Sequence, residues 1–168
     1  ASWFLKQDFG RTYRYYRDLL KLLDWQRPGE RWLLKAPAHM WAIDVLIETF
    51  PDVCVVWSHR NPLQCVASIC SMTEALMSGR ESFDPGQLGP VVMEFYATAL
   101  DRGRAARERH APSRFVDVDY RDFVSDPLAA AHGIYDHFGL PLPEATRAAL
   151  ADHVAEHPQA RHGRHEYS

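Results

Sequence analysis

The stretch VVWSHRNPLQCVAS, residues 55–68, decides the fold class that we expect for this chain. It opens with an apolar run of the kind that forms a buried strand. Asn61 and Pro62 then supply a helix N-cap and a proline for the first helical position. A cation, Arg60, and a hydroxyl, Ser68, flank this passage from a strand into a helix.

The rest of the chain continues the alternation of helices and strands. Apolar periodicity predicts helices over about 3–25, 40–50, 62–77, 91–109, 126–138 and 144–157, and strands over 31–35, 53–57 and 114–120. The strand at 53–57 is apolar on both faces, which is typical of a parallel sheet covered on both sides. We therefore expect an α/β fold, with right-handed crossovers that make three layers, α/β/α, around a parallel sheet.

Composition narrows the class of protein. The chain has 168 residues, of which 46% are apolar and 24% charged, and this predicts one globular domain over 1–168. A net charge of −3 gives no general basic field for nucleic acid. No apolar run approaches the roughly 18–20 residues that span a bilayer. Three cysteines without a CxxC pair favour a reducing compartment, and we expect a cytoplasmic protein.

The predicted strand ends carry the candidate functional side chains, because ligands bind at the carboxyl ends of parallel strands. Lys35 ends the first strand and could reach an anionic leaving group, or it is a surface lysine. His39 follows at the start of a helix, either as a general base or as a capping residue. Tyr120 ends the third strand, where its ring either stacks on a base or fills the edge of the core.

Arg60 and Ser68 together suggest an anion site. A helix N-terminus favours anions, and an arginine adds a fork of donors that suits phosphate. A phosphate that touches both side chains would lie along the flank of the helix. The alternative, equally open at this point, is that Arg60 pairs with an acid and Ser68 packs on a neighbouring helix.

Four motifs in order complete a resemblance that covers nearly the whole chain. RWLLKAPAHMWAIDVLIETFPDVCVVWSHRNPLQCVAS resembles the sulfotransferases that use 3′-phosphoadenosine 5′-phosphosulfate (PAPS), in the branch with K-x-P-x-H, F-P-D and H-R-D-P before a serine. VDYRDFVSDP is similar to the segment whose tyrosine contacts adenine. HPQARHGRHEY is similar to the loop that closes over the nucleotide.

The resemblance implies a P-loop-like fold with PAPS as co-substrate and no metal. Arg60 and Ser68 would hold the 3′-phosphate and Tyr120 the adenine, while Lys35 would serve the leaving oxygen. His39 would be the general base, a role that an acid from the amino-terminal half takes in some relatives. The closing loop would add Arg161, His162, Gly163 and Arg164 to the nucleotide site.

Two departures from the family pattern set further expectations. No Gly-rich 5′-phosphosulfate loop occurs in the chain, so we expect a piece of a longer protein that is missing its first strand and is inactive alone. Asn61 replaces the usual aspartate, and we expect little effect because both residues cap helices. The acceptor is expected to be a hydroxyl or amine on a small molecule, carbohydrate or lipid. The sequence leaves the oligomeric state open.

Two other functions compete with sulfuryl transfer. The missing loop would also fit a non-catalytic module that binds a nucleotide or assists assembly. A metal-dependent hydrolase is the third possibility, because His153 and His157 are four residues apart on a predicted helix, with His162 and His165 beyond them. The spacing offers no convincing third ligand.

Overall fold

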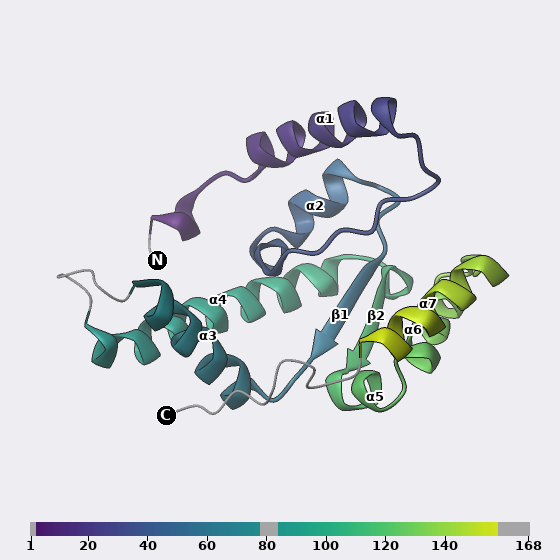
Figure 1. Cartoon of the computed structure of the whole chain (residues 1–168). Helices are drawn as coiled ribbons and strands as arrows, with labels where there is room; N and C mark the ends of the chain where they lie inside the picture. The colour runs from purple at the N-terminus through teal and green to yellow at the C-terminus, as the bar shows by residue number, and fades with distance from the viewer. Residues whose placement is uncertain (1–2, 78–83, 158–168) are drawn as a thin grey trace. The chain divides into compact units, whose positions relative to one another are not determined.

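The structure, a computed structural model, describes residues 3–77 and 84–157. The chain divides into two compact units. Unit 1 comprises Ala1–Val53 and Met93–Pro112, and unit 2 comprises Cys54–Val92 and Ser113–Ser168. Figure 1 shows the elements of both, and each unit is described by itself below.

Unit 1 is helical. Its elements are η1 (Phe4–Lys6), α1 (Gly10–Gln26), η2 (Pro37–Trp41), α2 (Ile43–Thr49) and the larger part of α4 (Leu88–Arg109). One core cluster joins α1 to the chain around α2 through Tyr13, Ala42 and Leu46. Five half-buried apolar side chains pack against it, namely Phe9, Tyr16, Val45, Phe50 and Val53. Tyr13 and Tyr16 lie on one face of α1 because residues three apart are neighbours on a helix.

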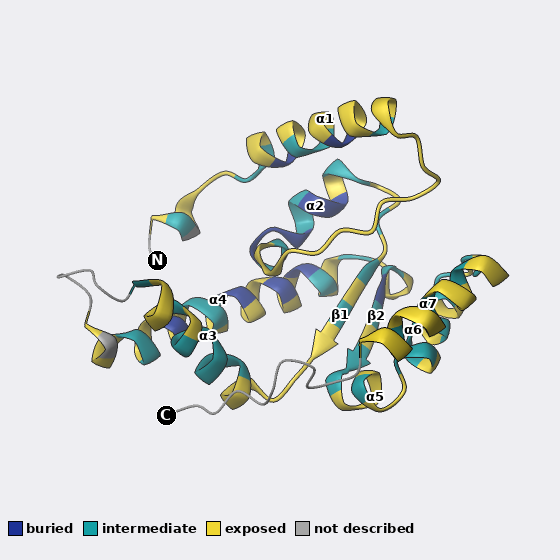
Figure 2. Ribbon diagram, in the orientation of Figure 1, coloured by how far each residue is buried: buried dark blue, intermediate teal, exposed yellow. Residues whose placement is uncertain are grey.

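A group of aromatic rings holds α4 within unit 1. The Trp41 ring centroid lies 4.5 Å from that of Phe95 and 5.5 Å from that of Tyr96. Phe4 meets Trp41 edge-on at 5.7 Å. Only 6% of Trp41 is exposed, so this ring is a main apolar anchor of the unit. Figure 2 shows buried residues on α2 and on the middle of α4.

Unit 2 contains a parallel pair of strands with helices around them. Strand β1 (Val55–His59) pairs with β2 (Phe115–Asp119), in a register that runs from Val55 opposite Phe115 to His59 opposite Asp119. The helices of this unit are α3 (Pro62–Met77), α5 (Tyr120–Ser125), α6 (Pro127–His137) and α7 (Glu144–Glu156). Both α5 and α6 contact β2, and α7 packs on α6. Figure 1 shows the two strands ending at the same edge of the sheet.

The predicted α/β fold with a parallel sheet is confirmed. Helix α3 has the predicted bounds, and Asn61 caps it by accepting a hydrogen bond from the Leu63 amide at 3.0 Å. Asp119 and Asp126 cap α5 and α6 in the same manner. Such caps satisfy amide groups that have no partner inside the helix, which explains why short polar residues mark these boundaries.

The predicted strand at 31–35 is wrong. Residues 31–36 form neither strand nor helix, and within the described ranges the only sheet is the pair of β1 and β2. A strand is held by hydrogen bonds to a neighbouring strand, so apolar composition alone does not make one. Leu33 is 96% exposed in this segment. The prediction that 53–57 is covered on both faces is also wrong, because Val56 is 45% exposed.

One predicted helix is divided in the structure, and one α-helix was not predicted. The expected helix at 40–50 consists of η2 and α2, which are separated at Ala42, where φ is −143°. The expected helix at 126–138 is α6, and the short helix α5, which was not predicted, precedes it, with the cap residue Asp126 between them. Helix α1 begins at Gly10 rather than near residue 3, and α4 begins at Leu88 rather than at 91. Among the described helices, none is both long and apolar enough to cross a bilayer.

Candidate functional site

The carboxyl ends of β1 and β2 bring Arg60 and Tyr120 into contact. Arg60 directly follows β1, and Tyr120 directly follows β2 as the first residue of α5. The Arg60 guanidinium carbon lies 4.5 Å from the centroid of the Tyr120 ring, which is a cation–π contact. The register places His59 opposite Asp119, so the residues after them meet at one edge. The predicted placement of Arg60 and Tyr120 at the carboxyl ends of strands is therefore confirmed, and the structure adds that the two strands are neighbours.

Arg60 supplies positive charge at this edge, and the start of α3 just after it adds little. Pro62 has no amide hydrogen, and the amide of Leu63 already donates to Asn61. These two positions therefore add little to an anion site, although a helix N-terminus generally favours one. The Arg60 Nε donates to Gln64 Oε1 at 3.4 Å, a long hydrogen bond that leans the side chain along the first turn.

Ser68 lies on α3, half-buried, eight residues beyond Arg60. The interactions described for Arg60 are those with Tyr120 and Gln64. That Arg60 and Ser68 share one anion therefore stays a prediction.

Two further pairs of side chains are hydrogen-bonded at the same edge of the sheet. His59 Nε2 lies 2.6 Å from Asp117 Oδ1, which links the ends of the two strands diagonally. Asp119 accepts hydrogen bonds from the side chain and the backbone amide of Arg121, and these bonds lower the pKa of the Asp119 carboxyl. Both pairs are exposed, so solvent screens them and each adds little to stability. The acids near Arg60 thus have partners of their own.

The other two predicted residues lie in unit 1. Lys35 is exposed, at the end of the irregular segment that leads to η2. His39 lies within η2, where its amide donates to the Ala36 carbonyl at 3.2 Å. Pro37 begins this short helix and fixes the turn after Lys35.

His39 contacts a buried tyrosine. Its Nδ1 lies 2.7 Å from the hydroxyl oxygen of Tyr13, and the Tyr16 ring lies 6.2 Å away, centroid to centroid. Burial lowers the pKa of His39, so the imidazole is neutral near pH 7. Burial raises the pKa of Tyr13 to about 12, with a smaller contribution from Tyr16, so its phenol stays protonated.

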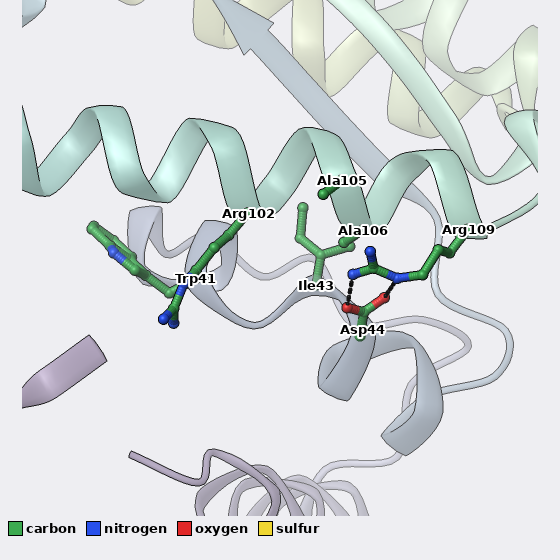
Figure 3. Close-up of a pocket in the computed structure, with 7 residues that line it drawn as sticks. All are labelled: Trp41, Ile43, Asp44, Arg102, Ala105, Ala106 and Arg109. Atoms are coloured by element: carbon green, nitrogen blue, oxygen red, sulfur yellow. Dashed lines mark hydrogen bonds and ion pairs between the residues drawn. The ribbon is translucent and has the colours of Figure 1, made fainter. Parts of the chain in front are cut away.

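A separate cavity of about 290 Å³ lies in unit 1 between α2 and α4. Figure 3 shows Arg109 of α4 reaching Asp44 of α2 at its rim. Asp44 is also bonded to His110, at 2.9 Å. Burial alone would raise the pKa of Asp44, but hydrogen bonds from Arg109 and His110 outweigh it and the pKa is lowered. The residues that line the cavity are Trp41, Ile43, Asp44, Arg102, Ala105, Ala106 and Arg109, none of them a predicted site residue.

The predicted nucleotide-closing residues Arg161, His162, Gly163 and Arg164 lie outside the described residues, as does His165. His153 and His157, the pair considered for a metal site, stack ring on ring with centroids 4.3 Å apart. His157 Nδ1 lies 3.0 Å from the His153 carbonyl oxygen, which makes it a cap of α7. Within 3–77 and 84–157, no group of three or more His, Cys, Asp or Glu side chains could hold a metal ion.

Two residues that contact the predicted site were missed. Gln64, four residues after Arg60, could have been found from helical spacing, because such positions are neighbours on a helix. Tyr13 lies 26 residues before His39, and its spacing on α1 marked it only as a core residue. No local signal in the sequence joins those two.

Comparisons with known proteins give one consistent result. The sequence profile of the sulfotransferase family matches residues 5–144. The omega-hydroxy-beta-dihydromenaquinone-9 sulfotransferases Stf3 of Mycobacterium bovis and Mycobacterium tuberculosis are each 28% identical to this chain over 127 residues, which is 74% of the chain. The chain spans only 33% of the length of these relatives.

Solved structures agree with the profile. Sulfotransferase STF1 from Mycobacterium tuberculosis H37Rv matches with a TM-score of 0.86 and 37% identity, over 90% of this chain and 42% of that one. Sulfotransferase STF9 from Mycobacterium avium matches with a TM-score of 0.86 and 31% identity, over 97% of this chain and 42% of that one. With the profile covering most of its length, this chain belongs to the sulfotransferase family.

Proposed function

We propose that this protein takes part in PAPS-dependent sulfuryl transfer, and that the edge formed by Arg60 and Tyr120 binds the 3′-phosphoadenosine part of the nucleotide. The observation that carries the proposal is the contact between these side chains at the ends of two adjacent parallel strands. An arginine fork suits phosphate, and a tyrosine ring suits a base. One face of the Tyr120 ring is covered by the guanidinium, so a stacked adenine would take the opposite face.

The 3′-phosphate is the group that we assign to Arg60. Its fork can bind two phosphate oxygens at once, and the neighbouring acids Asp117 and Asp119 are engaged by His59 and Arg121. Ser68, further along α3, would add a hydroxyl donor. This assignment requires the protein to prefer a 3′,5′-bisphosphate over a 5′-monophosphate.

Lys35 is proposed to act on the reacting group. Transfer moves an SO3 group from the nucleotide to an acceptor, and negative charge develops on the bridging oxygen that leaves. An exposed ammonium just before a fixed turn can donate to that oxygen. A hydroxyl acceptor fits the name of the Stf3 relatives, whose substrate is a hydroxylated menaquinone. For this protein we propose only the chemical class of the acceptor, which is a hydroxyl group on a small molecule or lipid.

Calorimetric titration with 3′-phosphoadenosine 5′-phosphate and, separately, with AMP tests the nucleotide proposal. If a charged contact reads the 3′-phosphate, the bisphosphate should bind tighter by about 1.5–3 kcal/mol. Equal affinities would contradict it. Incubation with labelled PAPS and a panel of hydroxyl acceptors then tests transfer. Because residues 1–168 contain no Gly-rich phosphate loop, we expect binding without labelled product from this chain alone.

A further inference from the structure

The hydrogen bond between Tyr13 and His39 is the strongest feature outside the nucleotide edge. The two atoms are 2.7 Å apart, and they join α1 to η2. Tyr13 is only 6% exposed and belongs to the core cluster of unit 1, so its ring is fixed. Tyr16, one turn further along α1, also lies near the imidazole, with ring centroids 6.2 Å apart and the rings tilted by 31°. The imidazole therefore has a defined place beside two tyrosines.

The direction of this hydrogen bond decides what the opposite nitrogen of His39 can do. If the phenol donates to Nδ1, the ring hydrogen of the neutral imidazole is on Nε2, which is then a donor. If Nδ1–H donates to the phenol oxygen, Nε2 keeps its lone pair and could act as a base. The two directions thus predict opposite roles for His39 in a reaction.

The partners available to the phenol favour the first direction. Within the described residues, His39 is the one hydrogen-bond partner found for the Tyr13 hydroxyl. If the imidazole were the donor, the phenol hydrogen would need a second acceptor in a largely buried place, and an unpaired buried hydroxyl is costly. No such need arises when the phenol donates to Nδ1. One bond then satisfies both groups.

We propose that Tyr13 is a positioning residue that holds His39 in the form with hydrogen on Nε2, so that His39 offers a hydrogen-bond donor rather than a base. This rests on the proposed function, in which Lys35 acts on the reacting group, because His39 lies four residues after Lys35, within η2. In this role Nε2–H donates to an oxygen of the reacting group and keeps its proton. The proton of the acceptor hydroxyl must then go to another group.

The surroundings of His39 allow a change in its pKa to be assigned to one neighbouring group. The titratable groups that contact its ring, within the part of the chain that the structure describes, are the two tyrosines of α1. The acid on the next helix, Asp44, is bonded to Arg109 and His110 instead. A change in the titration of His39 on removing the Tyr13 hydroxyl can therefore be assigned to that hydroxyl.

The test is nitrogen-15 NMR of the imidazoles in the full chain, with the His39 signals assigned by their loss in His39→Gln. We expect a pyridine-type Nδ1 and a pyrrole-type Nε2 in the neutral ring. Tyr13→Phe, which removes only the hydroxyl, should raise the pKa of His39 by roughly 0.5–1 pH unit, because the phenol stabilises the neutral ring. Tyr16→Phe is the matched control and should leave the pKa within about 0.2 of wild type, since no hydrogen bond to His39 is lost.

A pyridine-type Nε2 in the wild type, or a fall in the His39 pKa on Tyr13→Phe, would overturn the proposal. Should the variant fail to fold, the wild-type spectrum decides by itself. The spectra need no nucleotide, so a failure to bind 3′-phosphoadenosine 5′-phosphate would refute the proposed function while leaving this assignment of the hydrogen bond testable.

Discussion

Replacing Arg60 by alanine is the sharpest test of the nucleotide edge. The loss of stability should be small, because Arg60 is exposed and makes one cation–π contact, worth about 0.5–1 kcal/mol, and one long hydrogen bond to Gln64. The loss of bisphosphate binding should be larger, about 1.5–3 kcal/mol for a hydrogen-bonded charged contact. Since about 1.4 kcal/mol is tenfold, affinity for 3′-phosphoadenosine 5′-phosphate should fall by roughly 10- to 150-fold.

The assay is calorimetric titration of wild type and variants with the bisphosphate and with AMP. AMP lacks the 3′-phosphate, so its affinity should fall by less than about threefold in Arg60→Ala. Gln64→Ala is the matched control, because it removes the neighbour of Arg60 on α3 without changing the charge. Arg60→Lys keeps the charge but loses the fork, and it should give an intermediate loss for the bisphosphate.

The difference between the losses of affinity for the bisphosphate and for AMP, rather than either loss alone, decides whether Arg60 binds the 3′-phosphate. Equal losses of affinity for the two nucleotides in Arg60→Ala would show that Arg60 does not contact the 3′-phosphate. A loss in Gln64→Ala as large as that in Arg60→Ala would show that the first turn of α3 had been disturbed.

Two predictions concern unit 1. Lys35→Ala should lower the affinities for 3′-phosphoadenosine 5′-phosphate and for AMP by similar factors in calorimetry, because the oxygen that we assign to Lys35 stays on the 5′-phosphate that both nucleotides carry, and a loss for the bisphosphate alone would contradict this. Asp44→Asn should lower the free energy of unfolding by up to about 1 kcal/mol at pH 7. It removes the negative charge that pairs with Arg109 and His110, and the pair is worth little because Asp44 is partly exposed. The pKa of folded Asp44 is lowered, so this stability should be present above the usual carboxyl range and be lost as the pH falls through the lowered value. Urea unfolding at pH 7 and in acid measures it, with Asp101→Asn as control, and a difference that persists in acid would refute the assignment.

Short-range signals account for much of what could be predicted here. The helix after residue 61 was predictable because Asn61 and Pro62 carry their own boundary chemistry, and the structure uses both as expected. The strand β2 was predictable from its apolar alternation, and so was the position of Arg60 and Tyr120 at carboxyl ends of strands. Each of these rests on neighbours in sequence or on a general rule of topology. The pairing of those two strands, and with it the contact of the side chains, came only from the structure.

Burial and pairing were not predictable in the same way. The apolar run at 31–35 has the composition of a strand, yet strand structure needs a hydrogen-bonded neighbour that local sequence does not specify. The exposure of Val56 likewise depends on what covers the sheet.

The sequence by itself determined the class of fold, the helix that follows Arg60 and the types of side chain at the strand ends, because caps, periodicity and proline act over a few residues. Only the tertiary structure decided that the acids beside Arg60 pair with His59 and Arg121, and that His39 meets Tyr13 from 26 residues away. Hydrogen bonds between distant segments depend on packing and register. The hydrogen bond that a histidine makes in this way decides which ring nitrogen carries its proton, and local sequence does not specify that bond.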